Sequence, residues 1–507
     1  MKISRTFSAL LLALVLLAAA PAALVAQTGP QQQGIPARPE ELKYTPLTYN
    51  PPKRDRYRHV LSNGVVVYAV EDHDLPLVNI STLVHTGSYL EPADKVGLAS
   101  LVGSQMRAGG TAKMTAEQFD EAADFLAAQL SSGVGSTQGN ANLNLLAKDV
   151  DKGLALYLDM LRTPAFQEDR LKLAKSQILQ AMERRNDNTS AIEAREWGRL
   201  LYGAEHFSSK ETTKASVESI TRQDLIDFHQ KYFQPGGFII AASGDFKTPE
   251  LLAKLEAAFK GWPSNKMAVP DVPKPSQTPV AGIYTVNKPD VNQGRVSIGH
   301  LGSMRDNPDS YAVEIMNDIL GGGGFTSRIM SRVRSDEGLA YSAGSSYGMG
   351  VYYPGTFRAS FQSKSASTSQ AIQIVLDEIN HIRTQKVSAQ ELETAKNSAI
   401  ETFPRIFSTA AQIAGTFAQD EYTKRPADYW DTYRQRVAAV TTDDVQRVAQ
   451  KYLDPSKLVI LVVGNIDDIT KGNPDRPEYS LAKLAATGQI RRIPLPDPLT
   501  MVYPPAP

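Results

Sequence analysis

Hydrophobic and polar positions along the chain follow two periods, one typical of strands and one typical of helices. Apolar runs at residues 65–70 and 77–85 are bounded by turn signals and predict strands. Three later segments, at 115–130, 149–162 and 167–185, carry apolar residues at helical spacing. The first of these opens with a Thr-x-x-Gln capping box, which is typical of a helix start. The chain is therefore predicted to mix strands and helices.

The most informative pattern is an internal repeat in which equivalent residues stand 220 positions apart. A segment that runs from Thr221 to Gly244 recurs from Thr441 to Gly464 with the same threonine, lysine-tyrosine, proline and glycine positions. In both copies a helical segment leads through a proline into an apolar strand. We therefore predict an α+β fold of two homologous domains related by internal duplication.

Proline-rich stretches and the repeat divide the chain into six predicted parts. They are a signal peptide at 1–26, a flexible lead-in at 27–56, a first α+β domain at 57–262, a proline-rich linker at 263–280, a second α+β domain at 281–470 and a proline-rich tail at 471–507.

The N-terminus has the pattern of an export signal. Lys2 and Arg5 precede an apolar stretch, and small residues follow it. Cleavage could fall after Ala22 or after Ala26. The alternative is an uncleaved anchor, because residues 7–26 are just long enough to span a membrane. The small residues and the proline favour cleavage, so we expect a periplasmic or secreted protein without membrane attachment afterwards.

The composition excludes several kinds of function. The 507 residues include 54 lysines and arginines and 54 aspartates and glutamates, so no excess of positive charge indicates a nucleic-acid partner. The absence of cysteine excludes disulfides, thiolate ligands and a lipid-attachment cysteine. The glycine run at 321–324 is not a P-loop, because no Gly-Lys-Ser/Thr follows it.

A glycine-rich segment at residues 321–341 carries the candidate chemistry. It reads GGGGFTSRIMSRVRSDEGLAY. Four glycines cannot sit in a helix interior without a large entropic cost, so they predict a sharp turn or a close backbone approach. A short helix is expected from Phe325 and a strand from Leu339. Arg334 and Tyr341 then stand at a helix end and a strand start, close enough to project toward one site.

This segment resembles the second-half signature of the insulinase/pitrilysin family of zinc metallopeptidases, which includes mitochondrial processing peptidase. The resemblance extends from the turn at residues 61–64 to Gly464. It implies two related α+β halves, joined by a linker and closed like a clam shell. In that family an arginine and a tyrosine seven residues apart reach over the zinc site of the other half. The matching residues here are Arg334 and Tyr341.

The first half departs from the family at the zinc site. Active members carry an inverted His-x-x-Glu-His motif on the first helix, with two zinc ligands and a catalytic base, and a downstream glutamate completes the zinc shell. The matching positions here are Ser100, Gly103, Ser104 and Ala181. The resemblance therefore implies no zinc in this chain.

The spacing of the histidines also indicates that the chain has no zinc site. No two of the seven stand at the spacing of paired ligands on one helix. A site assembled from distant histidines is the alternative, and surface or locally hydrogen-bonded side chains are the simpler interpretation. They are His59, His73, His85, His206, His229, His300 and His381.

Two functions remain open at this point. The first is a non-catalytic subunit of a heterodimeric periplasmic zinc peptidase, whose homologous partner supplies the zinc motif and the zinc. Arg334 would then bind the peptide substrate, and Tyr341 would stabilise the oxyanion that forms on it. The alternative is a non-enzymatic scaffold or peptide-binding subunit. The presence of both residues favours the first.

Overall fold

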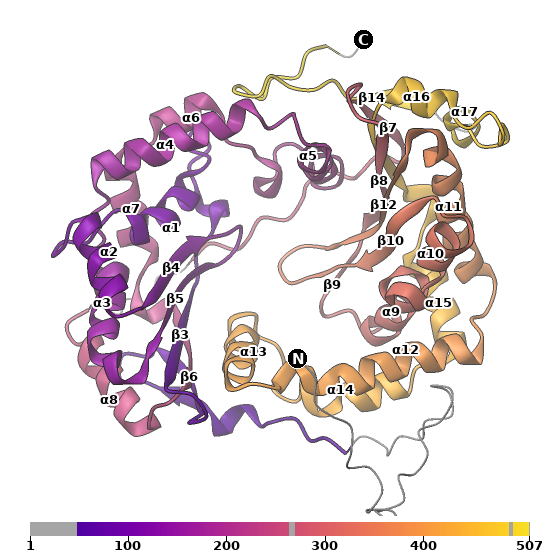
Figure 1. Cartoon of the computed structure of the whole chain (residues 1–507). Coiled ribbons are helices and arrows are strands. Elements are labelled where there is room, and N and C mark those ends of the chain that lie inside the picture. Colours follow the sequence, from indigo (N-terminus) through magenta and orange to yellow (C-terminus); the bar gives the residue numbers. More distant parts are fainter. Residues whose placement is uncertain (1–47, 263–268, 486–489, 506–507) are drawn as a thin grey trace, which may run out of the picture. The chain divides into compact units, whose positions relative to one another are not determined.

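The computed structural model of the chain describes residues 48–262, 269–485 and 490–505. The predicted signal peptide, most of the lead-in and part of the predicted linker lie outside these ranges. All the helices and strands of the described ranges belong to the structural unit that begins at Tyr49. They form two six-stranded mixed sheets with helices on both faces (Figure 1).

The first sheet has the strand order β1-β2-β6-β3-β5-β4. Its strands are β1 (Arg58–Val60), β2 (Val66–Glu71), β3 (Leu77–Val84), β4 (Gln129–Val134), β5 (Gly139–Leu146) and β6 (Phe238–Gly244). All neighbours pair antiparallel except β2 and β6, which are parallel. The strand β4 therefore forms one edge of this sheet.

The second sheet has the strand order β10-β12-β8-β13-β7-β14. Its strands are β7 (Gly282–Asn287), β8 (Gln293–Leu301), β10 (Ala340–Tyr347), β12 (Thr356–Lys364), β13 (Val459–Gly464) and β14 (Ile490–Arg492). Two short strands, β9 (Ser303–Met304) and β11 (Met349–Gly350), pair separately.

Helices surround both sheets. Those of the first half are α1 (Leu98–Ala108), α2 (Ala116–Phe125), α3 (Val150–Arg162), α4 (Glu168–Glu183), α5 (Thr189–Tyr202), α6 (Lys214–Ser219), α7 (Arg222–Tyr232) and α8 (Thr248–Phe259). Those of the second half are α9 (Ser310–Asn317), α10 (Arg328–Met330), α11 (Thr368–Thr384), α12 (Ala389–Thr402), α13 (Ala410–Tyr422), α14 (Tyr429–Ala438), α15 (Thr442–Tyr452), α16 (Ile466–Lys471) and α17 (Leu481–Leu484).

The α+β fold and its internal duplication are confirmed. The repeated segments become equivalent helix–strand pairs, α7 with β6 and α15 with β13, and each pair places its strand inside a sheet. Both helices begin with the same capping box, in which a threonine hydroxyl accepts from the backbone of the third helical residue. The exact domain boundaries, including those of the linker, stay predictions.

The repeated strands are apolar because both of their faces are covered. Every residue of β6 and of β13 is buried, as expected for central strands between two layers of helices. The outer face of the first sheet packs on residues of α1, α2, α3, α7 and α8 in one hydrophobic core. Its inner face contributes Tyr68, Ile239 and Ala241 to the core of the second half.

One helix of each half packs on the sheet of the other half. From the second half, α13 packs on β2 and β6 of the first sheet, and from the first half, α5 packs on β8 and β13 of the second sheet (Figure 1). The helices begin at Thr189 and Ala410, 221 positions apart, so they are counterparts in the repeat. Each half therefore completes the core of the other.

One local expectation from the sequence is wrong, and a second is confirmed in one of its two forms. The helix predicted at 115–130 ends at Phe125, because Ala127 takes a left-handed conformation with φ of 47° and β4 starts at Gln129. The first two glycines of the run lie in a π-helical turn, Asp318–Gly322, rather than in a simple turn. The expected close approach does occur, since a Cβ on Gly321 would lie 2.4 Å from the backbone nitrogen of Ser345.

The predicted tail takes part in both halves. It forms α17, and β14 adds to the second sheet beside β7. Further on, the Tyr503 hydroxyl donates to Glu196 of α5 at 2.7 Å, and the Leu499 carbonyl accepts from the backbone of Lys214 at 2.7 Å. The tail thus runs from the second sheet to helices of the first half.

A buried carboxylate holds α5 against the second sheet. Glu193 is 1 % exposed and accepts from Arg295 and Ser297 of β8, and from the Arg358 guanidinium of β12 at 2.6 Å. Buried charges are tolerated only when they are paired and hydrogen-bonded. This cluster therefore holds α5 of the first half against the second sheet.

We expect Glu193→Gln to lower the free energy of unfolding by about 3 kcal/mol, because two arginines lose the carboxylate that neutralises them. Denaturant unfolding followed by circular dichroism measures the change. The control is Glu250→Gln on the exposed face of α8, which should change stability by less than about 0.5 kcal/mol. Equal unfolding midpoints for the two variants would contradict a structural role of the cluster.

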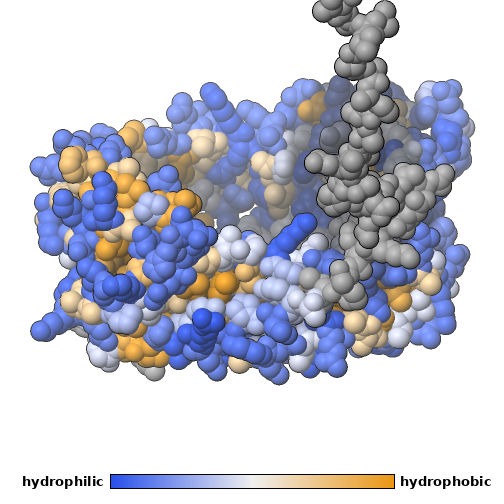
Figure 2. Space-filling model, turned by 60° about the horizontal axis from the view of Figure 1, so that its bottom comes forward, coloured by the Kyte–Doolittle hydropathy of each residue, from blue (hydrophilic) through white to orange (hydrophobic). Residues whose placement is uncertain are grey.

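The surface is largely polar. Figure 2 shows a mainly hydrophilic face, with hydrophobic residues gathered mostly at the left of the view. Within the three described ranges, no helix is both long and apolar enough to cross a membrane.

Candidate functional site

Arg334 and Tyr341 meet in an aromatic clamp, which we define as Phe325, Arg334 and Tyr341. The guanidinium carbon of Arg334 lies 4.6 Å from the ring centroid of Phe325 and 4.6 Å from that of Tyr341. Both distances are within the range of cation–π attraction. The prediction that the two residues project toward one place is thus supported by direct contact, with Phe325 as a third member.

Local backbone features create the clamp. Arg334 lies in the π-helical segment Ser331–Asp336, which Ile329 and Val333 anchor in the core. The turn after this segment contains Gly338, whose φ of 62° is a left-handed conformation that favours glycine. The Leu339 amide then donates to the Val333 carbonyl at 2.8 Å, and β10 begins at Ala340.

The clamp holds a half-buried cation between two exposed rings. Tyr341 is 84 % exposed and Phe325 is 67 % exposed. Among the described residues, no carboxylate forms an ion pair with Arg334, whose guanidinium lies over the two rings. Its neighbour Arg332, by contrast, pairs with Asp336 and Glu378. A guanidinium held between two rings keeps its donors available for a carbonyl or carboxylate.

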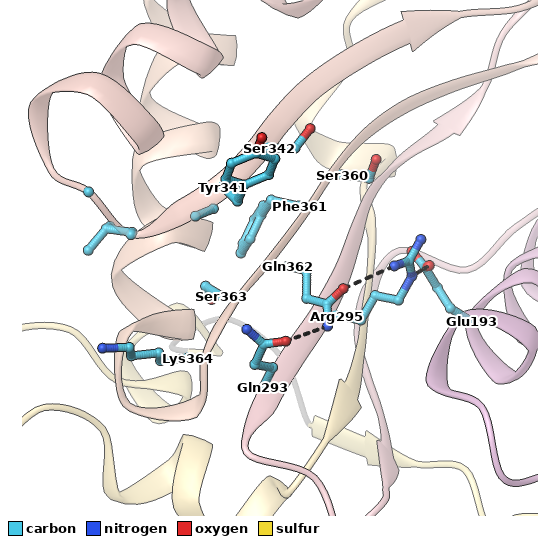
Figure 3. A pocket seen from close by; sticks show the side chains of 13 residues that line it. Glu193, Gln293, Arg295, Tyr341, Ser342, Ser360, Phe361, Gln362, Ser363 and Lys364 are labelled. Carbon is cyan, nitrogen blue, oxygen red and sulfur yellow. Dashed lines mark hydrogen bonds and ion pairs between the residues drawn. The ribbon is translucent and has the colours of Figure 1, made fainter.

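A pocket of about 480 Å³ lies next to the clamp on the second sheet. Figure 3 shows Tyr341 and Phe361 above a row of polar side chains from β8 and β12. In this row Gln362 donates to Gln293 at 2.7 Å and accepts from Arg295 at 3.3 Å. Tyr341 of the clamp therefore lines a cavity whose walls also carry amide, hydroxyl and charged side chains.

The four degenerate zinc-site positions lie on two helices in contact, α1 and α4. Ser100, Ser104 and Ala181 are exposed, whereas Gly103 is buried. The Ser104 hydroxyl donates to the Leu101 carbonyl of its own helix at 3.2 Å. None of the four supplies an imidazole or a carboxylate, so this surface offers no ligand set for zinc.

Gly103, which matches the position of the family's catalytic base, has no room for a side chain. A Cβ added to Gly103 would lie 2.3 Å from the backbone nitrogen of Val134 and 2.6 Å from the carbonyl carbon of Gly133. The strand β4 and the helix α1 are joined there, because the Ser132 hydroxyl donates to the Gly103 carbonyl at 2.6 Å. The chain thus lacks both the glutamate and the space for it.

A half-buried glutamate, Glu91, caps the start of the helix α1. Glu91 accepts from the backbone amides of Gly97 at 3.2 Å and Ala99 at 2.6 Å. Burial raises the pKa of Glu91 above its ordinary value, although these two hydrogen bonds act in the opposite direction. The first helix is therefore held by its own cap, independently of any metal.

The histidines are used locally. Nε2 of His229 lies 2.8 Å from the Leu161 carbonyl oxygen, and burial lowers the pKa of His229 to about 4. His206 and His300 also hydrogen-bond to carbonyl oxygens, and His85 stacks on Tyr422. Within the described part of the chain, no three histidine, aspartate or glutamate side chains gather as a metal site would require.

We expect the purified mature chain to hold no stoichiometric zinc and to show no peptidase activity by itself. The physical reason is the loss of all the ligands and of the base at positions 100, 103, 104 and 181. Elemental analysis of the protein, before and after a chelator, measures the metal. About one zinc per chain that a chelator removes together with activity would contradict this expectation.

Sequence reasoning missed two features of this surface. The sequence pattern predicts only a helix start at Phe325, although an aromatic residue beside a glycine run and near an arginine is a signal for a ring contact. Glu193 gives no signal in the sequence, because a glutamate on a helix is ordinarily solvated and its partners are 102 to 165 residues away.

Comparisons with known proteins agree with these observations. Residues 66–197 match the family described as "Insulinase (Peptidase family M16)", and residues 219–399 match "Peptidase M16 inactive domain". "Non-peptidase homolog YmxG" of Helicobacter pylori is 22 % identical over 404 residues, which cover 79 % of this chain and 91 % of the relative. "Probable mitochondrial-processing peptidase subunit beta" of Arabidopsis thaliana is 21 % identical and covers 82 % of this chain and 80 % of its own.

A solved structure is also similar. A "peptidase M16 inactive domain" from Pseudomonas fluorescens superposes with a TM-score of 0.72 and 25 % identity, and covers 80 % of this chain and 97 % of its own. Together with the missing zinc motif, these matches place the sequence within one known family. The chain belongs to the insulinase family, peptidase family M16, as a member of its non-catalytic type.

Proposed function

We propose that this chain is the non-catalytic subunit of a heterodimeric periplasmic zinc peptidase. It clamps the peptide substrate and assists the transition state, while a homologous partner carries the zinc motif and the metal. The observation that carries the proposal is the aromatic clamp. Its half-buried cation has no carboxylate partner among the described residues, although the residues matched to the zinc site of the family are replaced in the same chain.

The two polar members of the clamp suit different steps. The Arg334 guanidinium is a planar fork that can donate two hydrogen bonds to a substrate carbonyl or carboxylate. The Tyr341 hydroxyl can donate to the oxyanion that forms at the scissile carbonyl. The Phe325 ring keeps the guanidinium in place without neutralising it. Binding and transition-state stabilisation thus come from neighbouring side chains.

The partner supplies what this chain lacks. Zinc polarises a carbonyl and activates water when three protein ligands hold it, and the glutamate of the motif acts as the base. A relative is named as a subunit of mitochondrial processing peptidase, which supports assembly in pairs. The N-terminal export pattern supports the periplasmic location.

A scaffold or peptide-holding subunit without any catalytic part is the second candidate. The relative named as a non-peptidase homologue favours it, because that name includes no catalytic role. The two candidates differ in one result: only in the first does peptide hydrolysis depend on Arg334 and Tyr341.

Co-expression with a homologous chain that carries the His-x-x-Glu-His motif tests the proposal. The two chains should co-purify, and the pair should hydrolyse a quenched fluorescent peptide. Arg334→Ala should weaken peptide binding in the pair, and Arg332→Ala serves as the control, because Arg332 is already paired with acidic residues. Co-purification with no effect of Arg334→Ala would favour the scaffold.

A further inference from the structure

A second pocket, of about 310 Å³, lies on the inner face of the first sheet. No residue that lines it is ionisable, although 21 % of the chain is charged. Its polar side chains are amides and hydroxyls from four neighbouring strands: Asn79, Ser81, Gln129, Ser131, Asn142, Asn144 and Ser243. A solvent-facing sheet surface ordinarily carries charged residues, so this composition calls for an explanation.

The strand register places these side chains in two rows across the sheet. The first row is Gln129, Asn144, Asn79 and Ser243, and the second is Ser131, Asn142, Ser81 and Ala241. The rows are two residues apart along each strand, which is roughly 6.8 Å. The seven polar side chains of these rows form a regular array of uncharged groups, which we call the amide lattice, and Ala241 ends the second row.

The lattice is ordered and still has free hydrogen-bonding capacity. Asn142 accepts from Ser81 at 2.8 Å and donates to Ser131 at 3.1 Å, and Asn144 donates to Asn79 at 2.5 Å. The carbonyl oxygen of the Asn144 amide and the NH₂ group of Asn79 make no hydrogen bond to any described residue. The lattice can therefore both donate and accept.

Its two sides differ in access. At the edge strand β4, Gln129 and Ser131 are exposed. At the other side, Ser243 is 3 % exposed, and small residues of α13, among them Ala414 and Gly415, line the pocket. The pocket is thus open toward the edge strand β4 and bounded by α13 of the second half.

We propose that the amide lattice binds an extended peptide segment with uncharged side chains and excludes charged ones. In an extended peptide, side chains on one side repeat every two residues, which is the spacing of the rows. Amide groups complement the donors and acceptors of a peptide, and no aromatic ring is present for a sugar face to stack on. A charged side chain would lose hydration without gaining a counter-charge.

This inference rests on the proposed function, because it assumes that the chain binds peptides. It adds a preference for peptide segments with uncharged side chains. The clamp-side pocket offers a contrast, since Glu193, Arg295 and Lys364 line it. The two inner faces therefore present different chemistry to one substrate. An uncharged stretch fits the first sheet, and polar or charged groups fit the second.

The test uses the isolated mature chain and three labelled, end-blocked decapeptides, read by fluorescence anisotropy. One has a centre of serine, asparagine and alanine, and the others replace central residues by aspartate or by lysine. We expect the uncharged peptide to bind more tightly by about tenfold or more. Equal dissociation constants for the three peptides would overturn the inference.

A variant locates the site. Asn142→Asp should be tolerated, because the hydroxyls of Ser81 and Ser131 can both rotate to donate to a carboxylate. It should shift the preference toward the lysine peptide by about tenfold. The matched control is Asn140→Asp, an exposed position on the same strand outside the pocket, which should leave the preference unchanged. An unchanged preference in Asn142→Asp would place the peptide elsewhere and overturn the inference.

The outcomes separate this inference from the proposed function. If the isolated chain binds no peptide while hydrolysis by the pair still depends on Tyr341, only the lattice inference fails. If the lattice variants behave as expected while Tyr341 has no effect on hydrolysis, only the catalytic part of the proposed function fails.

Discussion

Tyr341→Phe should reduce turnover by the reconstituted pair by about 10²-fold, with a smaller change in KM. The substitution removes one oxygen from a ring that is 84 % exposed, so packing and assembly should be unchanged. A phenol that donates to a developing oxyanion contributes mainly in the transition state, which is why kcat falls more than substrate binding. Steady-state kinetics, with assembly checked by gel filtration, measures both quantities.

Two variants define the specificity of that result. Tyr347→Phe, at the other end of β10, removes the same atom from a half-buried ring outside the clamp and should leave turnover unchanged. Arg334→Lys keeps the charge but loses the planar fork, so it should raise KM. A pair that assembles with Tyr341→Phe and keeps full turnover would show that Tyr341 is structural.

Gly103→Ala should destabilise the protein by about 2 kcal/mol, although alanine is the better helix former by about 1 kcal/mol. The new methyl group would meet the backbone of Gly133 and Val134, which cannot move away as a flexible side chain could. Chemical denaturation followed by circular dichroism measures the change. A glutamate at this position should cost more still, so the zinc site could not be regained by restoring its residues alone.

Gly415→Ala is the matched control for this prediction. Gly415 is also helical, on α13, and a Cβ there would meet no atom within 4 Å. That variant should therefore be neutral or gain up to about 1 kcal/mol. If Gly103→Ala were stabilised to the same extent, α1 and β4 would have room to separate. The zinc site would then be absent only because the ligand residues are replaced, and not because the backbone leaves no space at Gly103.

Much of the fold could be predicted because it depends on local pattern. The repeat from Thr221 and from Thr441 indicated both helix–strand pairs, since capping boxes and apolar strands are local features. The helix predicted through residue 130 failed because apolar spacing does not reveal the left-handed turn at Ala127. Local pattern thus identified elements better than their ends.

What could not be predicted depends on contacts between distant residues. The apolar stripes of α5 and α13 show that each helix is buried, but not that each packs on the sheet of the other half. In the same way, the residue types at Ser100 and Ser104 showed that zinc ligands are missing. Only the structure shows that β4 fills the space beside Gly103.

The central claim, that this chain completes the active site of a zinc-bearing partner, is tested most directly by titration. The purified chain is added to the isolated partner, and hydrolysis of a quenched peptide is followed at each concentration. We predict a low rate for the partner alone and a rise that saturates at one chain per partner, with Tyr341→Phe saturating at the same ratio but a much lower rate. A partner that is fully active alone and gains nothing from the added chain would contradict the claim.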